Sequence, residues 1–297
     1  MNRSLERILP RVQKPARYTG GEYNAVVKDR RAVEVRYALC FPDTYEIGMS
    51  NLGVRILYGV MNNLPWCWCE RVFAPWGDME EEMRAEGLPL YGLESGDSIA
   101  DFDMIGFSLG YEMAYTNVLN MLDLAGLPVR AEERHELSPI IVAGGTCAYN
   151  PEPLAPFVDI FSLGEGEDVS VELLELYRKA KSEGWEKEEF LQAAARIPGL
   201  YVPSLYDISY NGDGTVAAIT PRDGAPEVVT KRIVQDFNKS YFPVKTIVPS
   251  TEITQDKVTL EVFRGCIRGC RFCQAGYAYR PVRSRDPELL VKYGIEA

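Results

Sequence analysis

Length, composition and charge set the first limits on what this chain does. It has 297 residues, 46 % of them hydrophobic, which is enough to bury a large core, and a net charge of −11 at pH 7. The length corresponds to about two domains, and the acidic balance argues against a nucleic-acid coat or a binder of anionic membranes. No apolar run approaches the roughly 18 residues of a membrane helix, and no apolar signal segment is seen near the N-terminus. We therefore expect a cytoplasmic protein without membrane contact.

Strands and helices alternate along the N-terminal part of the chain. Apolar runs that predict buried strands lie at 33–41, 71–74, 102–109, 139–143 and 158–163, and helical patterns lie at 51–62, 78–86, 114–125 and 169–182. This alternation predicts an α/β fold with a doubly wound, Rossmann-like parallel sheet. Ligands of such sheets bind beyond the carboxyl ends of the strands, where glycines let the backbone approach closely.

A β-hairpin and an extended linker are predicted after the sheet. Residues 204–210 and 216–220 flank Asn211-Gly-Asp-Gly214, a strong hairpin-turn signal. The stretch 226–254 is rich in Pro, Val, Thr and Lys, as expected of an extended linker. The resulting division is an N-terminal extension (1–24), the α/β domain (25–206), the hairpin and linker (207–256) and a final unit (257–297).

Three cysteines in the final unit carry the most specific chemical signal. Cys266, Cys270 and Cys273 follow a β-type run at 258–263 with the spacing C-x3-C-x2-C, and Phe272 precedes the last of them. Three thiolates can hold three irons of a [4Fe–4S] cluster and leave the fourth iron open for reaction. Structural zinc usually takes four ligands, and no further cysteine or histidine follows. The cluster is therefore favoured over zinc, and a disulfide is disfavoured in a reducing cytosol.

This motif after a strand resembles that of the radical S-adenosylmethionine (SAM) superfamily. The resemblance implies that Cys266, Cys270 and Cys273 hold the cluster on the loop after the first strand of a partial (β/α) barrel. It also implies that the open iron binds SAM, that Phe272 packs against the adenine side, and that reduction cleaves SAM to methionine and a 5′-deoxyadenosyl radical. The electron would come from a donor such as flavodoxin or ferredoxin, and the substrate stays open among RNA, protein and small metabolites.

A second resemblance lies in the loops of the predicted sheet. Cobalamin-binding domains carry D-x-H-x-x-G after their first strand, a serine loop after a middle strand and a Gly-Gly pair after a later one. The corresponding residues of this chain are Asp43, Tyr45, Gly48, Ser108, Gly144 and Gly145. Tyr45 stands where the cobalt-binding histidine would be, and a phenol with a pKa of about 10 is a poor ligand at neutral pH. Two interpretations stay open: a corrinoid bound without a protein ligand to cobalt, and a sheet whose glycines serve turns only.

A basic stretch surrounds the cysteines. Between Arg264 and Arg285 there are six arginines and no acidic residue. The arginines could form a positively charged opening around the cluster that binds the SAM carboxylate or an anionic substrate such as RNA. They could instead be solvated side chains that only balance the negative charge of the thiolates. Both interpretations stay open.

The final unit has room for only one strand, the cysteine loop and one helix that begins at Asp286 and Pro287. A (β/α) barrel needs on the order of 200 residues. We therefore expect only the first β/α unit of a radical SAM barrel, in an N-terminal fragment that is inactive alone. The alternative is a non-catalytic α/β domain that binds a ligand or partner and carries a structural cluster.

Overall fold

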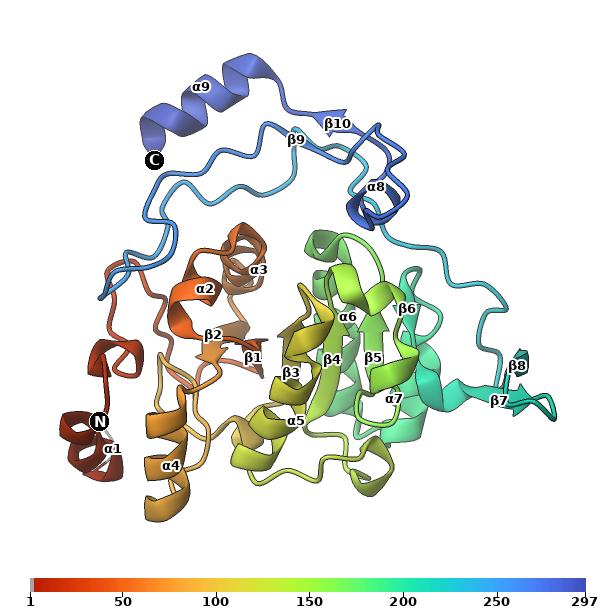
Figure 1. Cartoon of the computed structure of the whole chain (residues 1–297), viewed down its shortest axis with the longest axis horizontal. Helices are drawn as coiled ribbons and strands as arrows, with labels where there is room; N and C mark the ends of the chain where they lie inside the picture. The colour runs from red at the N-terminus through yellow and green to blue at the C-terminus, as the bar shows by residue number, and fades with distance from the viewer. Residues whose placement is uncertain (1–2) are drawn as a thin grey trace.

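A six-stranded sheet forms the centre of the computed structural model, which describes residues 3–297 (Figure 1). Its strands are β1 (Val35–Phe41), β2 (Cys67–Phe73), β3 (Met104–Ser108), β4 (Ile140–Gly144), β5 (Ile160–Ser162) and β6 (Leu200–Tyr201). They are ordered β2-β1-β3-β4-β5-β6, with β1 to β5 parallel and β6 antiparallel to β5. The predicted α/β class and its mostly parallel sheet are therefore confirmed.

Helices cover both faces of the sheet, as connections between parallel strands require. They are α2 (Tyr45–Met49), α3 (Leu52–Asn62), α4 (Gly77–Glu86), α5 (Tyr115–Leu124), α6 (Gly166–Glu183) and α7 (Lys187–Ala194). Helix α3 contacts α6, and Arg84 of α4 donates a hydrogen bond of 2.8 Å to Asp123 of α5. Figure 1 shows α5 in front of the sheet and α6 behind it, so the sheet is doubly wound.

Strands β1 and β2 are buried along their whole length, because helices cover both of their faces. Strand β2 begins at Cys67, four residues before the predicted run at 71–74, so Cys67 and Cys69 pack in the core. Helix α3 begins as predicted: the Asn51 side chain caps it by accepting the backbone N–H of Val54 at 3.1 Å.

Residues before the sheet are part of its core. Helix α1 (Arg3–Ile8) buries Leu5 and Ile8. Glu22 forms an ion pair of 2.8 Å with Arg71 of β2, and Arg71 also pairs with Glu94 at 2.7 Å. All three side chains are almost completely buried, so the N-terminal extension supplies a counter-charge inside the domain.

Beyond α6 the structure contains two elements that the sequence did not reveal, α7 and the short strand β6. The predicted hairpin follows them as β7 (Tyr206–Tyr210) and β8 (Val216–Pro221), paired antiparallel. Figure 1 shows this hairpin projecting from the side of the molecule. Most of its residues are exposed.

The C-terminal segment passes above the carboxyl ends of the strands (Figure 1). It contains β9 (Phe263–Arg264), α8 (Ala275–Ala278), β10 (Arg283–Ser284) and α9 (Pro287–Glu296). Helix α9 begins as predicted, with Asp286 accepting the N–H of Glu288 at 2.9 Å. The predicted first barrel strand at 258–263 is not confirmed, because only Phe263 lies in a strand and that strand pairs antiparallel with β10. Within residues 3–297 no helix has the length and apolar composition needed to cross a membrane.

Candidate functional site

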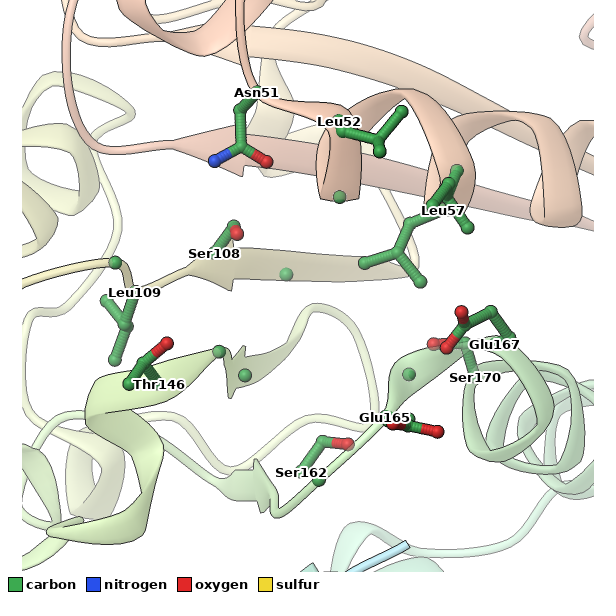
Figure 2. A pocket seen from close by; sticks show the side chains of 18 of the residues that line it. Asn51, Leu52, Leu57, Ser108, Leu109, Thr146, Ser162, Glu165, Glu167 and Ser170 are labelled. Atoms are coloured by element: carbon green, nitrogen blue, oxygen red, sulfur yellow. The ribbon is translucent and has the colours of Figure 1, made fainter. Parts of the chain in front are cut away.

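A cleft of about 500 Å³ lies at the carboxyl ends of β1, β3, β4 and β5 (Figure 2). It opens on the face of the sheet that α3 and α6 cover, and residues of both helices line it. The strand order reverses between β1 and β3. Sheets of this winding bind their ligands at such a switch point, and the volume is in the range of small-molecule sites.

The wall of the cleft on the α3 side is apolar. Leu52, Ile56 and Leu57 line it, and Figure 2 shows Leu52 and Leu57 on the helix, across from the strand ends. The main core is contacted mainly by other residues of this helix, Val54, Tyr58 and Met61.

On the strand side of the cleft, glycines leave the backbone without side chains that would fill the space. At Gly106 of β3, a Cβ atom would lie 1.7 Å from the hydroxyl oxygen of Tyr37, so only glycine lets the Tyr37 ring cross this strand. At Gly144 of β4, a Cβ atom would meet only Ser162, at 3.6 Å. The space above Gly144 therefore belongs to the cleft.

Three of the positions compared with cobalamin-binding domains line this cleft: Ser108, Gly144 and Gly145. Gly145 has a φ of +104°, and a Cβ atom there would lie 2.5 Å from the carbonyl oxygen of Leu109. Glycine is required at this turn for both reasons. The strand-end pattern in the sequence thus located part of the cleft.

The other three positions lie away from the cleft. Asp43 accepts a short hydrogen bond from the Tyr111 hydroxyl, and Gly48 packs beneath the ring of Phe73. Tyr45 is 1 % exposed and donates a hydrogen bond of 2.9 Å to Glu22. Burial raises the pKa of this phenol above its ordinary value. Tyr45 is therefore a core residue, and these three positions give the corrinoid interpretation no support.

A cluster of ion pairs closes one end of the cleft. Arg264 contacts Glu167 at 2.8 Å, Glu261 at 2.9 Å and Glu165 at 3.5 Å, and Glu165 also pairs with Arg283. Burial acts to lower the pKa of Arg264, but the carboxylates of Glu261 and Glu167 outweigh it and leave that pKa raised. This cluster joins the start of α6 to the segment just before the cysteines.

The basic stretch is therefore less positive than its sequence indicates. Arg264 and Arg283 are paired with carboxylates, and Arg285 is 3 % exposed and donates to the carbonyl of Phe237 at 2.6 Å. Arg268 and Arg271 are exposed. Only part of the arginine set is free to meet an anion.

The three cysteines lie on an exposed loop. Cys266 and Cys273 are half-buried, Cys270 is exposed, and all three are free thiols. The N–H of Cys273 donates to the carbonyl of Cys270 at 3.1 Å, and Phe272 is 93 % exposed. Among residues 3–297, no three Cys, His, Asp or Glu side chains converge as metal ligands. The donors thus fit an iron–sulfur cluster by their chemistry and proximity in the chain, without being gathered around one centre.

Hydrogen bonds hold the segment that follows the cysteines, residues 278–280, at the opening of the cleft. Thr146 lines the cleft and hydrogen bonds through its hydroxyl to that of Tyr279 at 2.6 Å. Tyr149 donates to the carbonyl of Ala278 at 2.9 Å. Lys231 of the linker donates to the same carbonyl at 3.0 Å and to that of Arg280 at 2.6 Å. Sequence reasoning missed these anchors, because each joins residues far apart in the chain.

Comparison with known proteins adds two findings. The family described as "Radical SAM proteins, N-terminal" matches residues 53–203, a range that contains most of the sheet and most residues of its cleft but not Cys266, Cys270 and Cys273. The chain is also 26 % identical over 256 residues to an uncharacterized protein of Methanocaldococcus jannaschii. That alignment covers 86 % of this chain and 44 % of the relative, so the chain spans less than half of the relative's length.

Proposed function

The chain belongs to the family of radical SAM proteins, N-terminal, and from this membership we propose that it binds a [4Fe–4S] cluster through Cys266, Cys270 and Cys273 and acts in SAM cleavage. The observation that carries the proposal is the set of three free thiols, spaced C-x3-C-x2-C, on a loop fastened beside the cleft. A cluster held by three thiolates keeps one iron open for a substrate. Held there and reduced, such a cluster would supply the electron needed for the reductive cleavage of SAM.

The protein's own residues hold and surround this centre. The thiolates of Cys266, Cys270 and Cys273 are the ligands, and each must lose its proton to bind iron. The exposed guanidinium groups of Arg268 and Arg271 lie in the same loop and are suited to bind the SAM carboxylate.

The test is anaerobic reconstitution of the 297-residue chain with iron and sulfide. We expect one [4Fe–4S] cluster per chain, with broad visible absorption that changes when SAM is added. Each of the variants Cys266→Ala, Cys270→Ala and Cys273→Ala should lose the absorption and the iron, because the cluster would lose one of its three thiolate ligands.

Cys147→Ala is the matched control. Cys147 is buried, and burial raises the pKa of its thiol to about 11, so it should take no part in holding iron. The proposal fails if the triple cysteine variant keeps its iron, or if the metal that purifies with the protein is zinc.

A further inference from the structure

The loop that carries the three cysteines is closed at its base by two short strands. Strands β9 and β10 pair antiparallel, with Arg264 opposite Arg283, and residues 265–282 form the loop between them. Gly265, the residue before the first cysteine, has a φ of +105°, and a Cβ atom there would lie 2.7 Å from the carbonyl oxygen of Pro281. Only glycine allows the two ends of the loop to approach this closely. The position of the cysteines therefore depends on how this base is held.

One carboxylate contacts the arginines on both sides of the base. Glu165 accepts hydrogen bonds from both terminal nitrogens of Arg283, one of them at 2.8 Å. Its Oε2 atom also lies 3.5 Å from a guanidinium nitrogen of Arg264, and its side chain is only 8 % exposed. Burial acts to raise the pKa of Glu165, but the hydrogen bonds of Arg283 outweigh it and leave that pKa lowered. Glu165 is therefore a buried anion between two cations.

The sheet domain holds Glu165 in place. This residue lies on the loop after β5 and immediately precedes α6, where the free N–H groups of the helix favour a negative charge. Its own N–H donates to the carbonyl of Arg232 at 3.0 Å, and its carboxylate accepts the N–H of Val234 at 2.7 Å. Glu261 also pairs with Arg264, but it lies in the same segment as the cysteines and cannot attach that segment to the sheet.

We propose that Glu165 is a positioning residue for the three cysteines: through Arg283 and Arg264, it fixes both ends of their loop at the opening of the cleft. This inference rests on the proposed function, because it takes the cysteines as the iron ligands. A cluster bound by three thiolates of a single loop can lie only where that loop places it. Glu165 therefore sets the position of the cluster relative to the sheet.

The first test uses the iron-free 297-residue chain and measures how fast iodoacetamide alkylates each cysteine, with the sites separated by mass spectrometry. In the wild type, the exposed Cys270 should react faster than the half-buried Cys266 and Cys273. Glu165→Gln keeps the size of the side chain but removes its charge, so the arginines lose their charge-assisted hydrogen bonds and the loop is released. Cys266 and Cys273 should then react as fast as Cys270. The four buried cysteines should stay unreactive in both proteins, which shows that the sheet remains folded.

Three further variants check that the effect belongs to this contact. Glu175→Gln is the matched control, because it makes the same chemical change at an exposed position of α6, and it should leave every rate unchanged. Arg283→Gln should reproduce the effect of Glu165→Gln, and the double variant should react no faster than either single variant. Wild-type rates in Glu165→Gln would overturn the inference. A further increase in the double variant would show that Glu165 does not act through Arg283.

A second measurement, on the chain reconstituted with iron and sulfide, distinguishes the positioning role from cluster binding itself. Glu165→Gln keeps all three thiolates, so it should hold as much iron and sulfide as the wild type. The electron paramagnetic resonance lines of its dithionite-reduced cluster should be broader, because a loop released at both ends holds the cluster in more than one geometry. Identical spectra would refute the positioning role and leave the cluster untouched. A wild type that binds no cluster would refute the proposed function, while the alkylation rates would still decide whether Glu165 fixes the loop.

Discussion

At the scale of single residues, Arg71 shows how this fold keeps a charge in its core. Its side chain is 1 % exposed in the middle of β2, between Glu22 and Glu94. Burial acts to raise the pKa of the Glu22 carboxyl, but the hydrogen bonds and charge of Arg71 outweigh it and hold that pKa below its ordinary value. Glu22 therefore depends on Arg71 to remain charged.

Arg71→Met should destabilise the protein by about 3–5 kcal/mol, because two carboxylates lose their buried partner. The measurement is urea unfolding at pH 7, followed by circular dichroism. Arg84→Met is the matched control: Arg84 also pairs with two carboxylates, but its side chain is 45 % exposed, so its loss should cost less than about 1 kcal/mol. Equal effects of the two substitutions would contradict this account of the triad.

The same triad predicts how the loss depends on pH. A carboxyl with a lowered pKa in the folded state stabilises the protein above its unfolded pKa, and this stability is lost as the pH falls through the folded value. In Arg71→Met, Glu22 stays buried without its cation, and protonation relieves the penalty. The stability gap between wild type and variant should therefore narrow as the pH falls from about 5 toward 3. A gap that stays constant over this range would show that Glu22 is not charged in the wild type.

At the scale of elements, the loop between β5 and α6 holds the linker against the sheet. Gly164 has a φ of +107°, and a Cβ atom there would lie 2.1 Å from the carbonyl oxygen of Arg232. Arg232 donates its N–H to Leu163 at 2.8 Å, and its carbonyl accepts from Glu165 at 3.0 Å. Because Lys231 donates hydrogen bonds to the carbonyls of Ala278 and Arg280, this contact also holds the segment that follows the cysteines.

Gly164→Ala should release the linker. Trypsin should then cut after Lys231 and Arg232 faster than in the wild type, while the circular dichroism spectrum of the sheet stays the same. Gly184→Ala is the control, since Gly184 also has a positive φ of +71° but nothing lies within 4 Å of its Cβ position. It should cost about 1–2 kcal/mol through backbone strain alone and leave the cleavage rate unchanged. Equal rates in all three proteins would refute the role of the Gly164 contact.

The sequence predicted the strands and helices whose apolar pattern follows from burial. It missed those whose formation depends on contacts with residues far away in the chain. Strands β1, β3 and β4 are buried apolar runs, and their ends located Ser108 and Gly144 in the cleft. Tyr37 was not predicted as a cleft residue, because β1 is buried on both faces and its pattern does not show which side chains meet an open space. The two-residue strand β6 is too short to leave a pattern. The run at 258–263 has β propensity but pairs only at Phe263, since a strand needs a neighbour.

At the scale of the whole molecule, the predicted boundary between the N-terminal extension (1–24) and the α/β domain (25–206) stays a prediction. The contacts of the first 24 residues suggest how to test it. The first residues bury Leu5 and Ile8, and the hydroxyl of Tyr91 donates to the carbonyl of Tyr18 at 2.9 Å. Glu22 adds the counter-charge of Arg71. A fragment that starts at residue 25 loses all of these contacts, whereas its sheet strands remain complete.

We therefore expect fragment 25–206 to be less stable than fragment 1–206 by at least about 3 kcal/mol, because Arg71 keeps only Glu94 as a buried partner and the buried side chains of Leu5 and Ile8 are lost from the core. Urea unfolding of both fragments measures the difference. The free energy of unfolding of the full chain should exceed that of fragment 1–206 by a smaller amount, because the residues after 206 add few side chains to the main core, among them Ile247 and Ile253.

The substitution Glu22→Gln in fragment 1–206 tests the contribution of the charge alone. It should reproduce part of the loss of stability, while the apolar contacts of Leu5 and Ile8 stay in place. Equal unfolding midpoints for the two fragments would place the start of the folding unit at residue 25 and assign Glu22 no role in its stability.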